Sequence, residues 1–264
     1  MHTKGMIGIA STLLVSALAQ AGAMGTQALP APYHPVVSVI GGFSAVSTHN
    51  SQTFTGADDE AFLYHHQKNN HHQGLIGVFL GVEHSLPSPD FLLQLGGEYT
   101  YFGPAHAQGL NFVGIEPSTY TTYTYNYRLQ SQQALAVAKV LKKIKPFVSK
   151  PYMFYPYASI GLGLAFNNSS DYGVSTQESG GVNLTPTFAN QHNRAFSYRL
   201  GVGVDTDIAP HLRAGLGYRF ADLGKASLGS GTIQFNGLAF PVPFSPHVPH
   251  VYANQLVAQI SYVA

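Results

Sequence analysis

The stretch "HLRAGLGYRFADLG", residues 211–224, decides the fold class of this chain. Apolar and aromatic side chains alternate here with glycine, alanine and arginine, and a period of two residues is typical of a β-strand with two different faces. Arg213 and Arg219 both fall on the face that is not apolar. Two unpaired guanidinium groups in the core of a soluble sheet would be very costly, so this face must look into a space that offers polar partners.

The same alternation recurs along the chain in segments of about ten residues, separated by stretches rich in Gly, Pro, Asn and Ser. We predict eight strands, at residues 35–46, 74–86, 91–103, 119–138, 153–167, 194–208, 211–222 and 249–263. In the fourth segment the apolar set is Tyr123, Tyr125, Tyr127 and Leu129, and Arg128 falls on the opposite face. Each segment therefore has one apolar face and one small or polar face.

The connections between these segments alternate in length. Short connections at 87–90 and 209–210 alternate with long ones at roughly 47–73, 104–118, 168–193 and 223–248, and a medium connection at 139–152 carries a run of lysines that begins at Lys139. One rim with tight turns and one with long loops is the pattern of an up-and-down sheet. The chain is therefore predicted to be all-β, an eight-stranded antiparallel up-and-down transmembrane β-barrel.

Aromatic residues and composition favour a membrane barrel over a soluble one. Two aromatic bands flank the aliphatic belt, with Phe43 and Phe196 near the long-loop rim and Phe91 and Tyr262 near the short-turn rim. Charged residues make up only 9 % of the chain, and the non-apolar face is mostly Gly, Ala, Ser and Gln. A soluble lipocalin-like barrel also alternates, but its exterior is charged, so it is the weaker alternative. With 13 Lys and Arg against 12 Asp and Glu, nothing indicates a nucleic-acid partner.

The N-terminus has the features of an export signal. Lys4 precedes an apolar run from Met6 to Ala19, and Ala21-Gly22-Ala23 provides a site of small residues for cleavage. A membrane-spanning helix would need about 20 apolar residues, and this run is shorter. We predict a signal peptide at residues 1–23, with residues 24–264 forming the barrel and its four long external loops.

A membrane barrel gives the two arginines a place, because its polar face lines the lumen. The predicted lumen charges form one set: Glu83, Glu98, Arg128, Arg199, Asp205, Arg213 and Arg219. One register of the hairpin at Ala209-Pro210 places Asp205 opposite Arg213 and Arg199 opposite Arg219, and a shift by two residues gives other pairs. Since eight strands leave an interior just wide enough for side chains, we expect an ionic network that plugs the pore. A gate or selectivity constriction is the alternative for the same residues.

The signal, the eight segments and "GYRFADLG" at Gly217–Gly224 give the chain a family resemblance. It resembles the small eight-stranded outer-membrane barrels of the OmpA, OmpX and opacity-protein type, over most of residues 35–264. The resemblance implies a multi-pass barrel in the outer membrane of a Gram-negative bacterium. No periplasmic peptidoglycan-binding domain is expected, because the sequence stops with the last strand.

Histidines in the first long connection are the only metal candidates. His65, His66, His71 and His72 lie within "YHHQKNNHHQ", and neutral imidazoles bind Zn²⁺ or Cu²⁺ when geometry fixes three or four of them. Adjacent histidines in an extended segment point in opposite directions, so a solvent-exposed polar loop is the favoured interpretation. No metal and no cofactor are predicted.

Three functions are compatible with such a chain. Long loops rich in Ser, Thr, Asn, Gly and Tyr favour membrane integrity combined with surface interaction, in which adhesin-like loops are held by a plugged barrel. A narrow channel for small solutes or ions is the alternative. A lipid A-modifying enzyme is less favoured, because His84-Ser85 lies near the short-turn rim and His247 and His250 have no neighbouring nucleophile other than Ser245. The expected partners are outer-membrane lipid, lipopolysaccharide and a host or cell-surface ligand.

Overall fold

The computed structural model describes residues 33–48, 50–56, 59–66, 70–88, 90–116, 120–145, 153–178, 186–235 and 238–264. The chain divides into two units, residues 1–32 and residues 33–264, and only the second is described. The predicted signal peptide at residues 1–23 lies outside the described residues. Among the described residues no helix is long and apolar enough to cross a membrane.

The described chain folds into strands throughout. Their bounds are β1 Tyr33–Ser47, β2 Ser51–Thr55, β3 Ala61–His66, β4 Asn70–Ser85, β5 Phe91–Phe102, β6 Ala105–Gly114, β7 Thr121–Lys142, β8 Phe154–Glu178, β9 Pro186–Phe188, β10 Gln191–Ala209, β11 Leu212–Asp222, β12 Ala226–Ser227, β13 Gly231–Phe235, β14 Leu238–Val242, β15 His247–Val248 and β16 Tyr252–Val263. Eight of them, β1, β4, β5, β7, β8, β10, β11 and β16, overlap the eight predicted segments.

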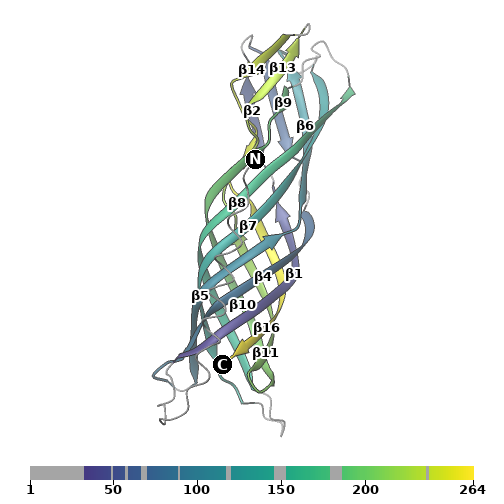
Figure 1. Ribbon diagram of the computed structural model, residues 1–264. Helices are drawn as coiled ribbons and strands as arrows, with labels where there is room; N and C mark the ends of the chain where they lie inside the picture. The colour runs from purple at the N-terminus through teal and green to yellow at the C-terminus, as the bar shows by residue number, and fades with distance from the viewer. Residues whose placement is uncertain are drawn as a thin grey trace, which may run out of the picture. The chain divides into compact units, whose positions relative to one another are not determined.

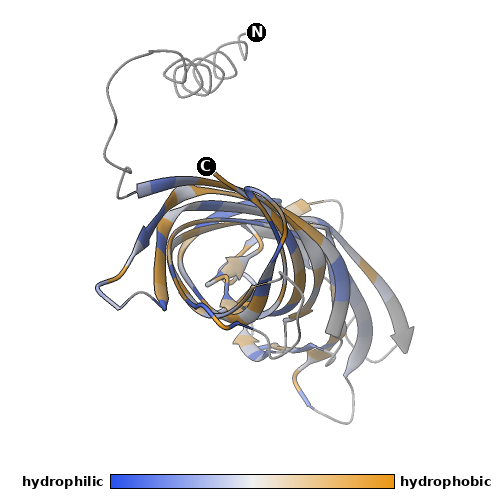
Figure 2. Ribbon diagram, turned by 90° about the horizontal axis from the view of Figure 1, so that it is seen from below, coloured by the Kyte–Doolittle hydropathy of each residue, from blue (hydrophilic) through white to orange (hydrophobic). Residues whose placement is uncertain are grey.

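These eight strands close into a ring. Hydrogen-bonded neighbours follow the order β7-β5-β4-β1-β16-β11-β10-β8, and β8 pairs again with β7. Every pairing in the ring is antiparallel, and the ring closes where the first strand, β1, pairs with the last strand, β16. The strands are strongly tilted in Figure 1, and the ring is seen along its axis in Figure 2. The prediction of an eight-stranded antiparallel up-and-down barrel is confirmed.

The outer wall of the ring is apolar, and the interior combines polar and charged side chains with buried apolar ones, among them Val36, Ile40 and Leu135. On β4 the side chains of Ile76, Val78 and Leu80 are exposed. The side chains of Phe79 and Glu83, which point to the other face of the same strand, are buried. Apolar and polar residues alternate along the strands in the same way in Figure 2. Because an exposed aliphatic belt is unstable in water, this wall is the surface that meets the hydrocarbon of a bilayer.

The β10–β11 hairpin adopts a different register from the one we favoured. Asp207 lies opposite Arg213 and Asp205 lies opposite Gly215, so each pair is shifted by two residues. The shift arises because β10 continues to Ala209 with an irregularity after Asp207, and His211 completes the turn at a φ of 65°. A shift by two leaves every side chain on its expected face but changes its neighbour across the ladder.

The long connections contain strands of their own. β6 continues beyond β5 along β7, β3 pairs with β6, and β2 pairs with β3. A second sheet, β14-β13-β9, lies in the same part of the molecule, at the end opposite the short turns (Figure 1). The short pair β12-β15 is joined to this part by hydrogen bonds from Asn50 and Gln52 to the carbonyl of His247. Together with the outer halves of β7 and β8 these strands form an outer extension of the barrel. Residues 47–73 and 104–118, predicted as loops, are therefore largely sheet.

An aromatic cluster fills the interior of the outer extension. Its buried members are Phe62, Tyr64, Ala107, Val113, Tyr123, Tyr125, Tyr127, Phe188 and Leu228, with Tyr172, Val174, Ile233, Phe54 and Phe244 packed against them. A bulge in β8 opposite Asn126 and Arg128, with Asp171 at a φ of 58°, turns Tyr172 toward this cluster. The extension thus has a mainly aromatic interior, whereas the barrel below it buries charged side chains beside its apolar ones.

Candidate functional site

Glu98 on β5 holds the centre of an ionic network in the barrel lumen. Its carboxylate accepts hydrogen bonds from both terminal nitrogens of Arg199, with Nη2 at 3.0 Å from Oε2. The same carboxylate accepts Nη1 of Arg219 and Oγ1 of Thr100, each at 3.0 Å. Glu98, Arg199 and Arg219 are 5 %, 1 % and 4 % exposed. One carboxylate therefore binds two guanidinium groups away from solvent, with bidentate geometry toward Arg199.

A second ion pair lies next to this centre. Nζ of Lys139 on β7 donates to Oδ2 of Asp205 on β10, and it also lies 3.9 Å from the centroid of the Tyr157 ring. Gln259 on β16 donates to the other oxygen of Asp205 at 2.9 Å and accepts from Arg219 at 3.4 Å. The amide therefore links the Lys139–Asp205 pair to the Glu98 centre across the lumen.

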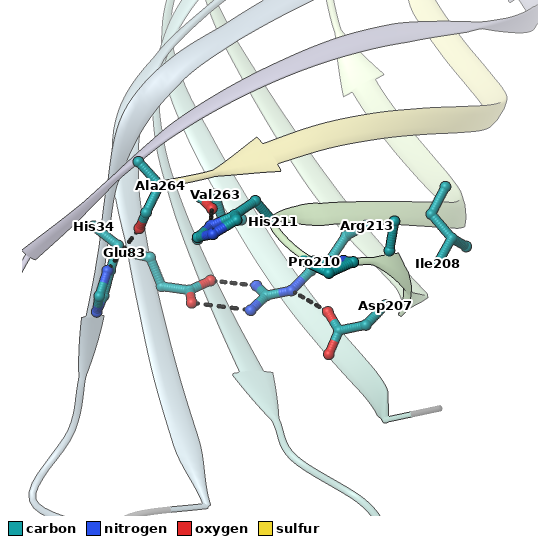
Figure 3. A pocket seen from close by; sticks show the side chains of 10 residues that line it. His34, Glu83, Asp207, Ile208, Pro210, His211, Arg213, Val263 and Ala264 are labelled. Atoms are coloured by element: carbon teal, nitrogen blue, oxygen red, sulfur yellow. Dashed lines mark hydrogen bonds and ion pairs between the residues drawn. The ribbon is translucent and has the colours of Figure 1, made fainter. Parts of the chain in front are cut away.

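A third cluster lies at the short-turn end of the lumen (Figure 3). Arg213 on β11 donates to both oxygens of Glu83 on β4, and its Nε donates to Asp207 at 3.0 Å. Its guanidinium lies 4.3 Å from the centroid of the Tyr155 ring, and the Tyr155 hydroxyl donates to Asp207 at 2.6 Å. A cavity of about 740 Å³, lined by these charged groups and by His34 and His211, opens at this end.

The charges in the lumen balance. Four carboxylates, of Glu83, Glu98, Asp205 and Asp207, face four cations, of Lys139, Arg199, Arg213 and Arg219. The space between Ser38, Glu98, Lys139, Arg199 and Arg219 is a void of about 20 Å³. A void of that size holds about one water molecule.

The structure brings six of the seven predicted lumen residues into the interior and leaves out the seventh. Glu83, Glu98, Arg199, Asp205, Arg213 and Arg219 are buried. Arg128 is exposed on the outer wall of β7, and its assignment to the lumen was wrong. The apolar set from Tyr123 to Leu129 predicts a lipid-facing side, which would leave Arg128 in the lumen. This part of β7 belongs to the outer extension, where the apolar face is the interior.

Two lumen residues were missed by sequence reasoning. Lys139 had been placed in a turn with the other lysines, but β7 runs on to Lys142 and carries Lys139 into the lumen. The signal was present in "ALAVAKVLK", because Ala134, Ala136 and Ala138 are small enough to face lipid and leave Lys139 on the other face. Asp207 shares the face of Asp205 two residues before it.

The histidine candidates do not converge. His65 is exposed, with Nδ1 hydrogen-bonded to the Ser51 hydroxyl at 2.8 Å. His66 points the other way and is hydrogen-bonded to the hydroxyls of Tyr125 at 2.6 Å and Tyr127 at 3.2 Å. His72 is exposed, and the His71 side chain lies outside what the structure describes. Within the described ranges no three His, Cys, Asp or Glu residues are placed to hold a metal ion.

The residues considered for lipid A chemistry are spread over the molecule. His84 stacks on Tyr33 at the short-turn end, with 4.9 Å between ring centroids. His250 is hydrogen-bonded to Asp222 at 2.8 Å and stacks on Tyr252, whereas the Ser245 hydroxyl donates to the carbonyl of Leu228. The Asp222–His250 pair and Ser245 therefore engage different partners.

Burial changes the acidity of the tyrosines in the outer extension. Desolvation raises the pKa of Tyr64, Tyr125 and Tyr172 well above the ordinary value, and neighbouring tyrosines add to the rise for Tyr64 and Tyr125. These hydroxyls lie in the outer extension, beyond the lipid belt. They stay neutral across the physiological range.

An eight-stranded antiparallel ring with an apolar outer wall and a charged lumen defines an outer-membrane barrel protein. The chain belongs to the outer membrane protein beta-barrel family, whose domain model matches residues 8–242. It is accordingly a protein of the outer membrane. The families it resembles are outer-membrane barrels and not, in general, enzymes. No curated protein matches the sequence significantly.

Solved structures similar to this chain include small outer-membrane barrels. Neisserial surface protein A is 13 % identical, with 86 % of this chain and 96 % of that one covered at a TM-score of 0.37. OprG from Pseudomonas aeruginosa is 8 % identical, with coverages of 86 % and 95 % and a TM-score of 0.39. The outer membrane protein AlkL is 13 % identical, with coverages of 92 % and 96 % and a TM-score of 0.35.

Proposed function

We propose that this protein is a closed outer-membrane barrel that supports membrane integrity and presents its outer extension for surface interaction. The observation that carries the proposal is the balanced ionic network in the lumen, with a void of only about 20 Å³ at the level of Glu98. Above it the aromatic cluster occupies the interior of the extension. A barrel filled at both levels is suited to holding a surface structure rather than to conducting solutes.

The outer extension supports the surface role because it exposes apolar side chains to water. Leu238 and Phe240 on β14 are 64 % and 48 % exposed, and β14 is an edge strand of its sheet. Exposed apolar groups on a sheet edge are typical of protein contact sites. Short turns face the periplasm in bacterial barrels, so the extension lies on the cell exterior. A host or cell-surface ligand is the partner we propose.

Closure of the lumen is tested by single-channel conductance in a planar bilayer. We expect the refolded wild-type protein to be silent. Arg213→Ala and Arg219→Ala should produce discrete openings, because each removes a large side chain from the lumen and leaves a carboxylate to draw in water. Gln234→Ala, on the extension, serves as the control and should stay silent. Discrete wild-type openings would instead support the alternative, a narrow channel for small solutes or ions.

The surface role is tested by adhesion of Gram-negative cells that display the protein to cultured epithelial cells. The double variant Leu238→Ser and Phe240→Ser should lower adhesion at least several-fold, because it removes the exposed apolar groups of β14. Gln234→Ala is exposed on the neighbouring strand, opposite Ala239, and should adhere as the wild type does. Equal adhesion of all variants at equal surface levels would contradict this role.

A further inference from the structure

The outer wall of the barrel carries two exposed arginines just above the lipid belt. Arg128 lies on β7 and Arg194 on β10, and the Arg194 guanidinium lies 5.9 Å from the centroid of the Phe166 ring. Neither arginine takes part in a salt bridge within the described part of the chain. His106 on β6 is exposed directly opposite Arg128 in the ladder. This wall therefore presents positive charge to whatever lies beside it.

The two arginines flank β8 at a separation that one large headgroup can span. Arg194 lies opposite Phe166 of β8, and Arg128 lies opposite Ser170 of β8. The register shift between β7 and β8 begins only after Ser170, so it does not affect this offset. An offset of four residues across two strand spacings puts their Cα atoms roughly 16 Å apart. Arginine side chains are long and flexible, so both can approach the same anionic molecule.

A polar band separates Arg128 from the lipid belt. The Tyr99 hydroxyl donates to Gln132 at 2.6 Å, and the Tyr101 hydroxyl donates to Gln130 at 3.3 Å. Tyrosines with their hydroxyl groups in a polar layer are typical of the level of lipid headgroups. Arg128 lies above this level on the side of the extension, where phosphate groups of the outer leaflet are found, and Arg194 lies two residues beyond the exposed Phe196 on β10.

Below the polar band the wall is hollowed. A shallow groove of about 640 Å³ is bordered by Val78 and Leu80 of β4, Gly97 and Tyr99 of β5 and Ala134 of β7. Gly97 faces open space, with nothing within 4 Å of the position of a Cβ atom. The groove is apolar and lies in the same wall as Arg128, four strand residues below Gln130 on β7. An extended acyl chain fits such a groove, because it buries apolar surface along its whole length.

Among the residues that the structure describes, one carboxylate lies beside Arg128. Asp171 is exposed at the β8 bulge beside Ser170, whose hydroxyl donates to it at 3.1 Å. It forms no salt bridge with Arg128 in the described structure. Two arginines against one aspartate leave the region cationic, so its charge is complementary to an anion with more than one negative group.

We propose that this wall binds a phosphorylated, multiply acylated lipid of the outer leaflet, the chemical class of lipopolysaccharide. Arg128 and Arg194 bind its phosphates, and one acyl chain lies in the groove at Gly97 and Ala134. Guanidinium groups match phosphate oxygens in pairs, and neither lysine nor a neutral side chain provides that geometry. The inference rests on the place of the barrel in the outer membrane and does not depend on closure of the lumen.

The test is a binding titration of the refolded protein in phosphatidylcholine nanodiscs, read by native mass spectrometry. The probes are a hexa-acylated diphosphoryl lipid A and the same lipid with its phosphates removed. We expect Arg128→Gln combined with Arg194→Gln to raise the Kd for the phosphorylated lipid at least tenfold and to leave the Kd for the dephosphorylated lipid unchanged. Gly97→Leu fills the groove and should weaken binding of both lipids.

Two matched controls separate the site from general effects of charge and shape. Lys142→Gln removes an exposed cation from β7 at the other rim, and Gly41→Leu adds a side chain to open space on β1. Both should bind lipid A as the wild type does. The proposal is overturned if Lys142→Gln weakens binding as much as the double arginine variant, or if the arginine and Gly97 variants bind unchanged. Conductance is measured without lipid A, so failure of this site and failure of lumen closure are distinguishable.

Discussion

At the scale of single residues, Glu98 has the largest structural role in the lumen. Its carboxylate is the shared acceptor for Arg199 and Arg219, and all three side chains are buried. Charges in such a place are tolerated only because they are paired and hydrogen-bonded. A substitution here therefore acts on two other residues as well as on the one replaced.

Glu98→Gln should destabilise the barrel by about 3–5 kcal/mol, because it leaves two buried guanidinium groups without a counter-charge. The measurement is the free energy of unfolding of the lipid-embedded protein in urea. The folded fraction is read from the gel mobility of unboiled samples. Asp90→Asn makes the same chemical change at an exposed turn and should stay within about 0.5 kcal/mol of the wild type. A loss below about 1 kcal/mol for Glu98→Gln would mean that water solvates the arginines in the lumen.

At the scale of elements, β7 shows how one strand can serve two environments. Its odd-numbered residues face inward from Tyr123 to Leu141, so the phase of the strand never changes. The outer part faces water outside and aromatic rings inside, whereas the inner part faces lipid outside and buries Leu135, Val137 and Leu141 together with Lys139 inside. The surroundings of both faces therefore change near Gln130, although the side to which each residue points does not.

The outer extension should lose its stability at alkaline pH. Burial raises the pKa of Tyr64, Tyr125 and Tyr172 above the unfolded value, so their contribution is complete below the ordinary tyrosine pKa and is lost as pH rises toward the folded values. Tyrosinate absorbance at 295 nm should show a late component that appears only when the extension opens. Tyr125→Phe should reduce its amplitude by one tyrosine. Ionisation of every tyrosine near pH 10 in the intact protein would contradict the burial.

At the scale of the whole molecule, the position of the bilayer follows from the outer wall. Leu256 is 64 % exposed on β16 and lies between Tyr252 and Tyr262, whose rings are exposed toward the two rims. Thr122 lies on the outer face of β7 at the far end of the extension. Leu256 should therefore contact lipid, and Thr122 should contact water.

Leu256→Arg should destabilise the protein in bilayers by about 2–4 kcal/mol, because a guanidinium group near the midplane must be desolvated. Thr122→Arg places the same side chain in water and should change stability by less than about 0.5 kcal/mol. Unfolding in urea from phosphatidylcholine vesicles measures both. Equal effects of the two substitutions would mean that the bilayer lies elsewhere along the barrel.

The ring of eight strands and the faces of most of them could be predicted from the sequence. A strand has a side-chain period of two, so "HLRAGLGYRFADLG" already places Arg213 and Arg219 on one face and Leu216 and Tyr218 on the other. Because lipid lies outside the barrel and a narrow lumen lies inside it, the alternation is strong in each segment. The alternation can be recognised without knowing which strands are paired.

The partners of those residues were decided only by the tertiary structure. A register shift by two preserves the faces, so the alternation could not distinguish Asp205 from Asp207 as the residue opposite Arg213. Glu98 meets Arg199 and Arg219 across the lumen, from strands that are far apart in the sequence. Whether Arg128 points inward or outward could not be predicted from alternation alone. Near Arg128 the outer side of β7 meets water and its apolar residues point inward, whereas further along the same strand the outer side meets lipid.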